Sequence, residues 1–189
     1  MRRRHILAAM LAGLGLTAAP VLIAPRPWLV WNASASVPVG LYRVLAEDDI
    51  VVGDLVAVTP PADLATFLAE RGALPRGVPM LKHVAALAGA TVCRGGAPVL
   101  IDGSRAAMAL PRDRQGRPLP AWSGCRTLAP GEVFLLNPDA PESLDGRYFG
   151  PLPVSAIVAR LTPLWTETPT PEAAIPLPAS ISDEPAIPH

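Results

Sequence analysis

Two closely spaced serines and a single lysine are residues of this chain whose types could carry out nucleophilic chemistry on a carbonyl group. Ser34 and Ser36 lie in the segment 32–43, where Pro38 and Gly40 impose a specific backbone path. A serine hydroxyl is a weak nucleophile until a neighbouring base removes its proton. The segment therefore indicates catalysis only if the chain supplies a base elsewhere.

Lys82 is the first candidate for that base, because it is the only lysine among 16 lysine and arginine residues. A codon bias toward arginine explains the excess of arginine, but it does not explain why this position holds a lysine. A free lysine is protonated at neutral pH, whereas burial among apolar groups lowers its pKa. The segment 78–87 around Lys82 is largely apolar. The alternative is a lysine that reaches water from a strand edge.

Histidine is the more common base, and the chain contains three histidines. His5 lies in a basic N-terminal segment and His189 ends a proline-rich segment, so only His83 could serve. Lys82 and His83 are neighbours on a predicted strand, where adjacent side chains point to opposite faces. We therefore expect one of them to face the serines, and the sequence leaves open which.

The composition excludes a nucleic-acid partner and favours β structure. A formal net charge of +0 and a pI of about 6.8 provide no basic surface for nucleic acid. The 24 prolines and 15 glycines favour many turns and disfavour a helical bundle. We expect a mainly β domain.

The N-terminal segment has the pattern of a membrane anchor. Residues 1–5 are basic, and residues 6–24 form an uncharged apolar run that would span roughly 28 Å as a helix. Positive residues favour the cytoplasmic side, so we expect residues 1–5 in the cytoplasm, an inner-membrane anchor at 6–24 and the remainder in the periplasm. Trp28 and Trp31 would lie at the membrane interface. The alternative is a secretory signal cleaved near residues 16–19.

Residues 25–165 are predicted to form one exported domain of short strands with a single helix. The helix is predicted over 62–71, where apolar residues share one face and a glycine follows. The segments 112–120 and 137–153 are predicted as a polar loop and a long irregular connection, and the proline-rich residues 166–189 as a disordered tail. The predicted strands are 41–45, 54–58, 80–87, 91–94, 99–101, 132–136 and 154–161.

Cys93 and Cys125 are the two cysteines of the chain. In an exported domain an even pair predicts a disulfide, here one that encloses the loop 112–120. Two cysteines with one nearby histidine lack the spacing of a metal site, and neither cysteine lies in a setting typical of catalysis. We expect a disulfide, with no metal and no other cofactor.

Three segments form a pattern that is more specific than any of them alone. The first is Asn-x-Ser-x-Ser-x-Pro-x-Gly-Leu-Tyr at 32–42, and the second is Lys-His-Val-Ala at 82–85, followed by Gly89. The third is Ser-Leu-Asp-Gly-Arg-Tyr-Phe-Gly-Pro at 143–151. In this order, behind one apolar segment, the pattern resembles the bacterial signal peptidase family in its conjugative-transfer (TraF-type) branch. The resemblance implies an irregular β-sheet or barrel catalytic domain behind a single transmembrane helix.

The resemblance also implies a role for each matching residue. Ser36 would be the nucleophile, and Lys82 would be the general base that later protonates the leaving amine. The backbone N–H of Ser36 and the hydroxyl of Ser34 would form the oxyanion hole, and the alternative for Ser34 is an ordinary turn hydroxyl. A polar support would orient the lysine or brace its loop, and its members are Ser143, Asp145 and Arg147. The alternative for Asp145 and Arg147 is a plain turn with a surface ion pair.

The function that the resemblance implies is that of a membrane-anchored serine endopeptidase, which cleaves exported precursor proteins through an acyl-enzyme. We expect the substrate to bind in an extended conformation along a strand edge. The transfer branch implies maturation of a conjugative pilin precursor within a type IV secretion system, and some relatives join the ends of the pilin. Two alternatives stay open: a general leader peptidase for secreted proteins, and a non-enzymatic scaffold domain of the cell envelope.

Overall fold

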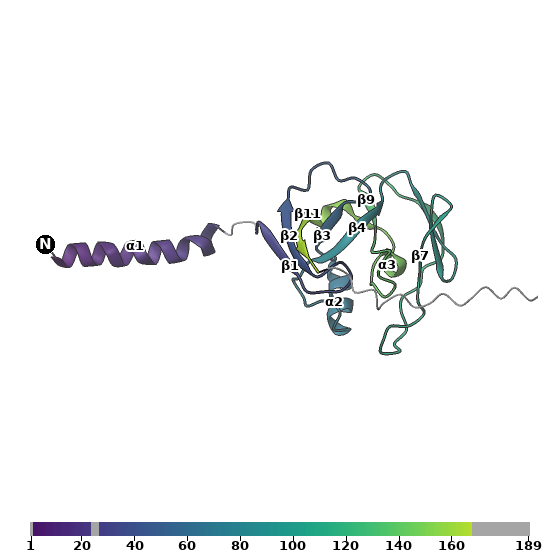
Figure 1. Ribbon diagram of the computed structural model, residues 1–189, viewed down its shortest axis with the longest axis horizontal. Coiled ribbons are helices and arrows are strands. Elements are labelled where there is room, and N and C mark those ends of the chain that lie inside the picture. The colour runs from purple at the N-terminus through teal and green to yellow at the C-terminus, as the bar shows by residue number, and fades with distance from the viewer. Residues whose placement is uncertain (1, 24–26, 168–189) are drawn as a thin grey trace, which may run out of the picture.

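The computed structural model describes residues 2–23 and 27–167 of the chain. The first element is helix α1 (Arg2–Ile23), which extends away from a β domain (Figure 1). Within the described residues, no helix is long and apolar enough to span a membrane. The anchor predicted at 6–24 therefore stays a prediction.

The domain is built from two antiparallel sheets, as the mainly β prediction required (Figure 1). The larger sheet has seven strands in the order β1 (Leu29–Asn32), β2 (Gly40–Leu45), β11 (Ile157–Thr166), β3 (Leu55–Val58), β4 (Met80–Ala86), β9 (Glu132–Leu136) and β10 (Leu152–Pro153). The smaller sheet has four strands in the order β7 (Ser104–Met108), β6 (Pro98–Ile101), β5 (Thr91–Arg94) and β8 (Gly124–Thr127). Strand β4, which carries Lys82, pairs with β3 on one side and with β9 on the other.

The central strands and one helix lie where the sequence predicts them. Helix α2 (Ala62–Glu70) ends one residue before the predicted limit, because Arg71 is its C-cap residue. Between β6 and β7, Asp102 and Gly103 both have positive φ, at 48° and 78°. These angles suit the two-residue hairpin turn that an Asp-Gly pair favours.

The largest differences from the predicted boundaries lie between residues 137 and 166. The segment 137–153, predicted as irregular, contains helix α3 (Gly146–Phe149), whose N-terminus is capped by the Asp145 side chain. The strand predicted from 154 begins later, because Val154–Ala156 forms a 3-10 helix before β11. Strand β11 continues to Thr166, so the tail predicted from that residue begins with ordered chain. Residues 168–189 lie outside the described residues.

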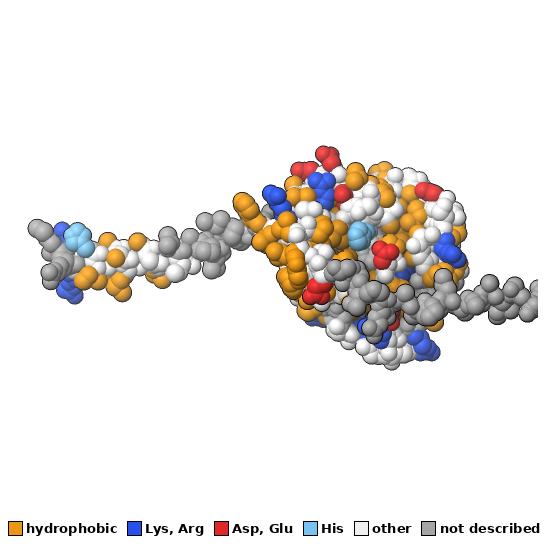
Figure 2. Space-filling view, viewed as in Figure 1, with side chains coloured by type: hydrophobic (Ala, Val, Ile, Leu, Met, Phe, Trp, Pro, Cys, Tyr) orange, Lys and Arg blue, Asp and Glu red, His pale blue; other side chains and the backbone are white. Residues whose placement is uncertain are grey.

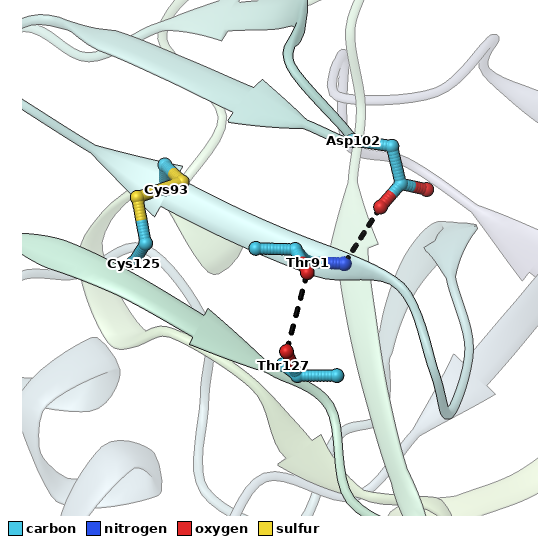
Figure 3. The surroundings of a disulfide bond; sticks show 5 residues. All are labelled: Thr91, Cys93, Asp102, Cys125 and Thr127. Atoms are coloured by element: carbon cyan, nitrogen blue, oxygen red, sulfur yellow. Dashed lines mark hydrogen bonds between the residues drawn. A yellow bond between two sulfur atoms is a disulfide. The ribbon is translucent and has the colours of Figure 1, made fainter.

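The smaller sheet contains the predicted disulfide pair. Cys93 on β5 and Cys125 on β8 are direct partners in the antiparallel register, and a disulfide joins them (Figure 3). Beside it, the hydroxyls of Thr91 and Thr127 lie 3.2 Å apart, and the Thr91 N–H donates to the Asp102 carboxylate at 2.7 Å. The disulfide therefore fastens β5 to β8, at a sequence separation of 32 residues.

Replacing both Cys93 and Cys125 by alanine is expected to lower the free energy of unfolding by about 3–4 kcal/mol, because the unfolded chain gains loop entropy. Urea unfolding of both proteins under non-reducing conditions measures the difference. Equal unfolding midpoints would contradict this expectation.

Candidate active site

Asn32 shapes the turn that carries Ser36, between the end of β1 and the start of β2. This side chain is buried, and its Nδ2 group donates to the carbonyls of Ser34 at 2.8 Å, Val37 at 3.1 Å and Pro38 at 3.1 Å. Its Oδ1 accepts from the N–H of Ser34 at 3.1 Å and from the Ser34 hydroxyl at 2.9 Å. One amide side chain thus satisfies the polar backbone groups of a turn that has no sheet partner of its own.

Tyr42 and Val37 hold this turn against the larger sheet. The buried Tyr42 hydroxyl donates to the carbonyl of Pro38 at 2.6 Å. Val37 is 4% exposed and packs in the same apolar cluster as Leu81, the residue before Lys82. This packing brings the segment of Ser36 close to the segment of Lys82.

Ser36 is half-buried, and its Oγ lies 3.2 Å from the Oγ of the exposed Ser34. Because the Ser34 hydroxyl donates to Asn32, it can only accept from Ser36 in this contact. The Ser34 proton therefore points toward Asn32 and not outward. A role of Ser34 in an oxyanion hole requires this hydroxyl to rotate, and that role stays a prediction.

Lys82 is buried, at 4% exposure, on strand β4. Its Nζ donates to the Oγ of Ser143 at 2.7 Å. Burial lowers the pKa of the Lys82 ammonium from its usual 10.5 to about 8, with Asp145 acting to raise it and Arg147 to lower it further. Lys82 is therefore not a lysine that reaches water from a strand edge.

Asp145 and Arg147 form a buried ion pair beside this lysine, each with 1% exposure. Arg147 donates to the Asp145 carboxylate from Nε at 2.9 Å and from Nη2 at 2.8 Å. The guanidinium also donates to the carbonyls of Asn137 at 2.8 Å, Ala140 at 2.7 Å and Pro141 at 3.0 Å. The pair therefore fixes the loop that presents Ser143, and the surface ion pair weighed as an alternative is wrong.

The smaller sheet braces helix α3, which carries Arg147. Arg94 of β5 is 6% exposed, and its Nη1 donates to the carbonyl of Arg147. Trp122 donates from Nε1 to the carbonyl of Gly146 at 3.0 Å, and Tyr148 accepts from the N–H of Leu110 at 2.9 Å. These contacts link the disulfide-containing sheet to the support of Lys82.

The structure separates the two neighbours on β4. Lys82 contacts Ser143, whereas His83 places its Nδ1 at 3.1 Å from Oδ1 of Asn137. Among the described residues, no hydrogen bond joins Ser36 to Lys82: Ser36 is bonded to Ser34, and Lys82 to Ser143. The same part of the chain contains no group of three His, Cys, Asp or Glu side chains that could hold a metal ion.

The structure shows two buried asparagines for which the sequence predicted no role. Asn32 stands at the first position of the serine segment but was given no role, and Asn137 was assigned to an irregular connection. Both are buried, at 6% and 2% exposure, and each makes several hydrogen bonds from its amide. A buried amide costs free energy unless it is bonded, but the sequence does not show which asparagines are buried.

Gly40 of the serine segment is the first residue of β2 and pairs with Thr166 at the end of β11. A Cβ atom there would lie 2.2 Å from the carbonyl oxygen of Trp165 and 2.7 Å from Cα of Thr166. Gly40→Ala is expected to destabilise the domain by about 3 kcal/mol, the upper end for overpacking. Thermal unfolding measures the effect. Gly95→Ala is the matched control, since its Cβ would have no neighbour within 4 Å; equal losses in both variants would contradict the account.

The comparison with protein families decides the assignment. Residues 2–165 match the family described as signal peptidase, peptidase S26. The chain belongs to this family. It is therefore a peptidase, and the segments that resembled the signal peptidases lie within the matched region.

The relatives of this signal-peptidase chain include proteins of conjugation. The chain is 36% identical over 149 residues to a "Probable conjugal transfer protein TraF" of Sinorhizobium fredii, covering 73% of this chain and 77% of the relative. It is 34% identical over 182 residues to a "Conjugal transfer protein TraF" of Agrobacterium fabrum, covering 89% and 100%. It is 33% identical over 145 residues to a "Plasmid transfer protein TraF" of Escherichia coli, covering 71% and 81%.

A solved signal peptidase also matches the chain. The crystal structure of a signal peptidase I from Enterococcus faecalis shares 20% sequence identity and a TM-score of 0.37, covering 61% of this chain and 98% of that one. A similarity at this level carries no argument about the site.

Proposed function

We propose that this peptidase is a serine endopeptidase that uses Ser36 as its nucleophile and Lys82 as its general base. The observation that carries the proposal is the state of Lys82, the only lysine of the chain. It is buried, held by one hydroxyl, and has a pKa of about 8. A lysine with a pKa lowered in this way can accept a proton near neutral pH, which is what a general base must do.

The proposed reaction proceeds through an acyl-enzyme. Neutral Lys82 takes the proton of Ser36 as the serine oxygen bonds to the substrate carbonyl carbon. The C–N bond then breaks, and the Lys82 ammonium gives its proton to the leaving amine. Water attacks the ester next: Lys82 takes a proton from water and returns it to Ser36 as the acyl C–O bond breaks. The carboxylic acid product leaves with Ser36 and Lys82 restored.

The reaction requires Ser36 to exchange its contact with Ser34 for one with Lys82. Catalytic hydrogen bonds often tighten only when substrate is bound, so the separation of the two groups here is compatible with the mechanism. For Ser34 to donate as well, its hydroxyl must rotate away from Oδ1 of Asn32. That hydroxyl and the N–H of Ser36 are the donors that we propose for the oxyanion.

The proposed substrate is an exported precursor protein, and specifically a conjugative pilin precursor. The support for this choice is the similarity to transfer proteins named TraF, at 33–36% identity. The substrate would bind extended along a strand edge, and type IV secretion components are proposed partners. Resolution of the acyl-enzyme by the substrate's own amine would give a cyclic product, and resolution by water a linear one.

The proposed location is the inner membrane, with residues 1–5 in the cytoplasm, residues 6–24 as the anchor and the catalytic domain in the periplasm. Figure 2 shows apolar side chains gathered on the side of the domain from which α1 extends. Exposed apolar residues on strands β1 and β11 and just before β1 include Trp28, Leu29, Trp31, Leu164 and Trp165, and the rings of Trp31 and Trp165 stack at 5.9 Å. Exposed tryptophans suit a membrane–water interface.

The rate of peptide cleavage should depend on pH through Lys82. With a pKa of about 8, roughly one molecule in ten holds neutral Lys82 at pH 7. Because the base must be neutral, kcat/KM should rise about tenfold from pH 6 to pH 7 and level off above pH 8. A profile that is flat from pH 6 upward, or one with its midpoint near 10.4, would contradict the assignment.

The experiment that tests the function identifies the precursor that accumulates when this protein is inactivated. Cells that express the wild type, Ser36→Ala or Lys82→Arg are compared by mass spectrometry of their membrane proteins. Unprocessed pilin should accumulate in both variants. Accumulation of many leader-bearing proteins would favour a general leader peptidase, and normal processing in both variants would leave the scaffold alternative.

A further inference from the structure

We propose that Asn137 is the positioning residue of the general base, holding the main chain on both sides of Lys82 and tying it to the loop of Ser143. The inference rests on the proposed role of Lys82 and extends it to a residue outside the three segments that resemble the signal peptidases. Three observations carry it. They are the hydrogen bonds from the Asn137 side chain to the main chain of β4, the register of β9 against β4, and the hydrogen bonds of the Asn137 backbone.

The side chain of Asn137 spans Lys82 along strand β4. Its Nδ2 donates to the carbonyl of Leu81 at 3.1 Å, and its Oδ1 accepts from the N–H of His83 at 3.2 Å. The same Oδ1 lies 3.1 Å from Nδ1 of His83. One buried amide therefore fixes the peptide groups immediately before and immediately after the base.

The register of the sheet explains why a side chain is needed here. Strand β9 ends at Leu136, which pairs with His83 of β4. Continuing that antiparallel register would place Asn137 opposite Lys82 and Pro138 opposite Leu81. Proline has no N–H to donate to a neighbouring strand. The Asn137 side-chain amide thus continues the hydrogen bonding to β4 beyond Leu136, where the backbone pairing of β9 ends.

The backbone of Asn137 joins the same residue to the ion pair. Its N–H donates to Oδ2 of Asp145 at 3.0 Å, and its carbonyl accepts from Nη2 of Arg147 at 2.8 Å. That ion pair fixes the loop of Ser143, which holds the Lys82 ammonium. Asn137 is therefore the one residue bonded both to the main chain around Lys82 and to the support of its hydroxyl partner, within the described part of the chain.

Removing the Asn137 side chain should change the charge state of Lys82. The charged groups that act on this ammonium are Asp145 and Arg147, and His83 is its titratable neighbour on β4. The neighbouring strands present Val56 and Leu135, which are apolar. Loss of the amide frees two peptide groups that must then bind water, and water beside Lys82 stabilises its charged form. The pKa of Lys82 should therefore rise toward its usual value.

The test uses the full chain in detergent, with isotope-labelled lysine. Lys82 is the only lysine, so its side chain gives a single NMR signal whose shift follows protonation without any substrate. The titration midpoint should lie near 8 in the wild type and move upward in Asn137→Ala. The acidic limb of the pH profile of kcat should move by the same amount, with KM little changed, because Asn137 holds the main chain on either side of the base.

Matched controls separate positioning from loss of stability. Asn32→Ala removes the other buried asparagine, at the serine turn, and should slow cleavage without moving the Lys82 midpoint. Val99→Ala makes a cavity in the smaller sheet, where Val99 is fully buried, and should lower stability without moving it either. Asn137→Asp keeps the acceptor for His83 but loses the donor and adds charge near Lys82, so its midpoint should rise further than that of Asn137→Ala.

The outcomes distinguish this inference from the proposed function. A wild-type midpoint in folded Asn137→Ala and Asn137→Asp would overturn the positioning role, whatever their activities. Equal midpoint shifts in Val99→Ala would show general loosening and would overturn it too. Full cleavage by Lys82→Arg would instead overturn the proposed function, while the midpoints would still report on Asn137.

Discussion

Lys82→Arg is expected to lower the rate of peptide cleavage by about 10²- to 10⁴-fold, the range that a general base contributes. The substitution keeps a positive charge, but a guanidinium stays protonated throughout the pH range of the assay, so it cannot accept a proton. The loss should therefore persist at every pH from 6 to 10. Single-turnover cleavage of a synthetic precursor peptide measures it, with circular dichroism to show that the variant is folded.

Arg126→Lys is the matched control for this substitution. It also exchanges one basic residue for the other, on β8 of the smaller sheet, where the Arg126 side chain is 49% exposed and pairs with Glu132 of β9. Its cleavage rate should equal that of the wild type. Cleavage by Lys82→Arg at more than a tenth of the wild-type rate would mean that another group acts as the base.

Arg147→Met should destabilise the domain by about 3–5 kcal/mol, the cost of leaving one partner of a buried ion pair without its counter-charge. Asp145 would then be a buried carboxylate with 1% exposure, and the loop of Ser143 would lose its three carbonyl contacts with the guanidinium. The pKa of Lys82 should also rise, because Arg147 is one of the groups that lower it. Urea unfolding gives the stability, and the pH profile of cleavage gives the second effect.

Arg114→Met tests whether the effect comes from burial. Arg114 forms an ion pair with Glu142, but the two side chains are 76% and 44% exposed. Exposed pairs contribute little to stability because water and salt screen them. The unfolding midpoint of Arg114→Met should stay close to that of the wild type. A comparable loss in both variants would contradict the role given to the Asp145–Arg147 pair.

The sequence was most informative where a physical requirement shows in the residue type. A solitary lysine in an apolar segment implied a buried amine, and the structure places Lys82 at 4% exposure with its pKa lowered. The Asp-Gly pair at 102–103 implied a hairpin turn because few other residues adopt positive φ. The central strands followed from their short apolar runs. These predictions depend on local properties, which a single chain displays directly.

The predictions failed where tertiary contacts decide the structure. Helix α3 is short, and its start depends on Asp145, which also accepts from Asn137 eight residues away. The roles of Asn32 and Asn137 depend on which carbonyls come within reach after folding. Strand β1 was missed because its sequence, with two tryptophans nearby, also suits a membrane interface. No local pattern separates these cases.

Trapping the acyl-enzyme is the measurement that tests the Ser36–Lys82 account most directly. Wild-type protein is mixed with a precursor peptide, quenched with acid in the first turnover, digested and analysed by mass spectrometry. The account predicts an added acyl group on the peptide that contains Ser36, with the mass of the N-terminal substrate fragment, and no adduct in Ser36→Ala or Lys82→Arg. An adduct on another residue, or undiminished cleavage by Ser36→Ala, would contradict it.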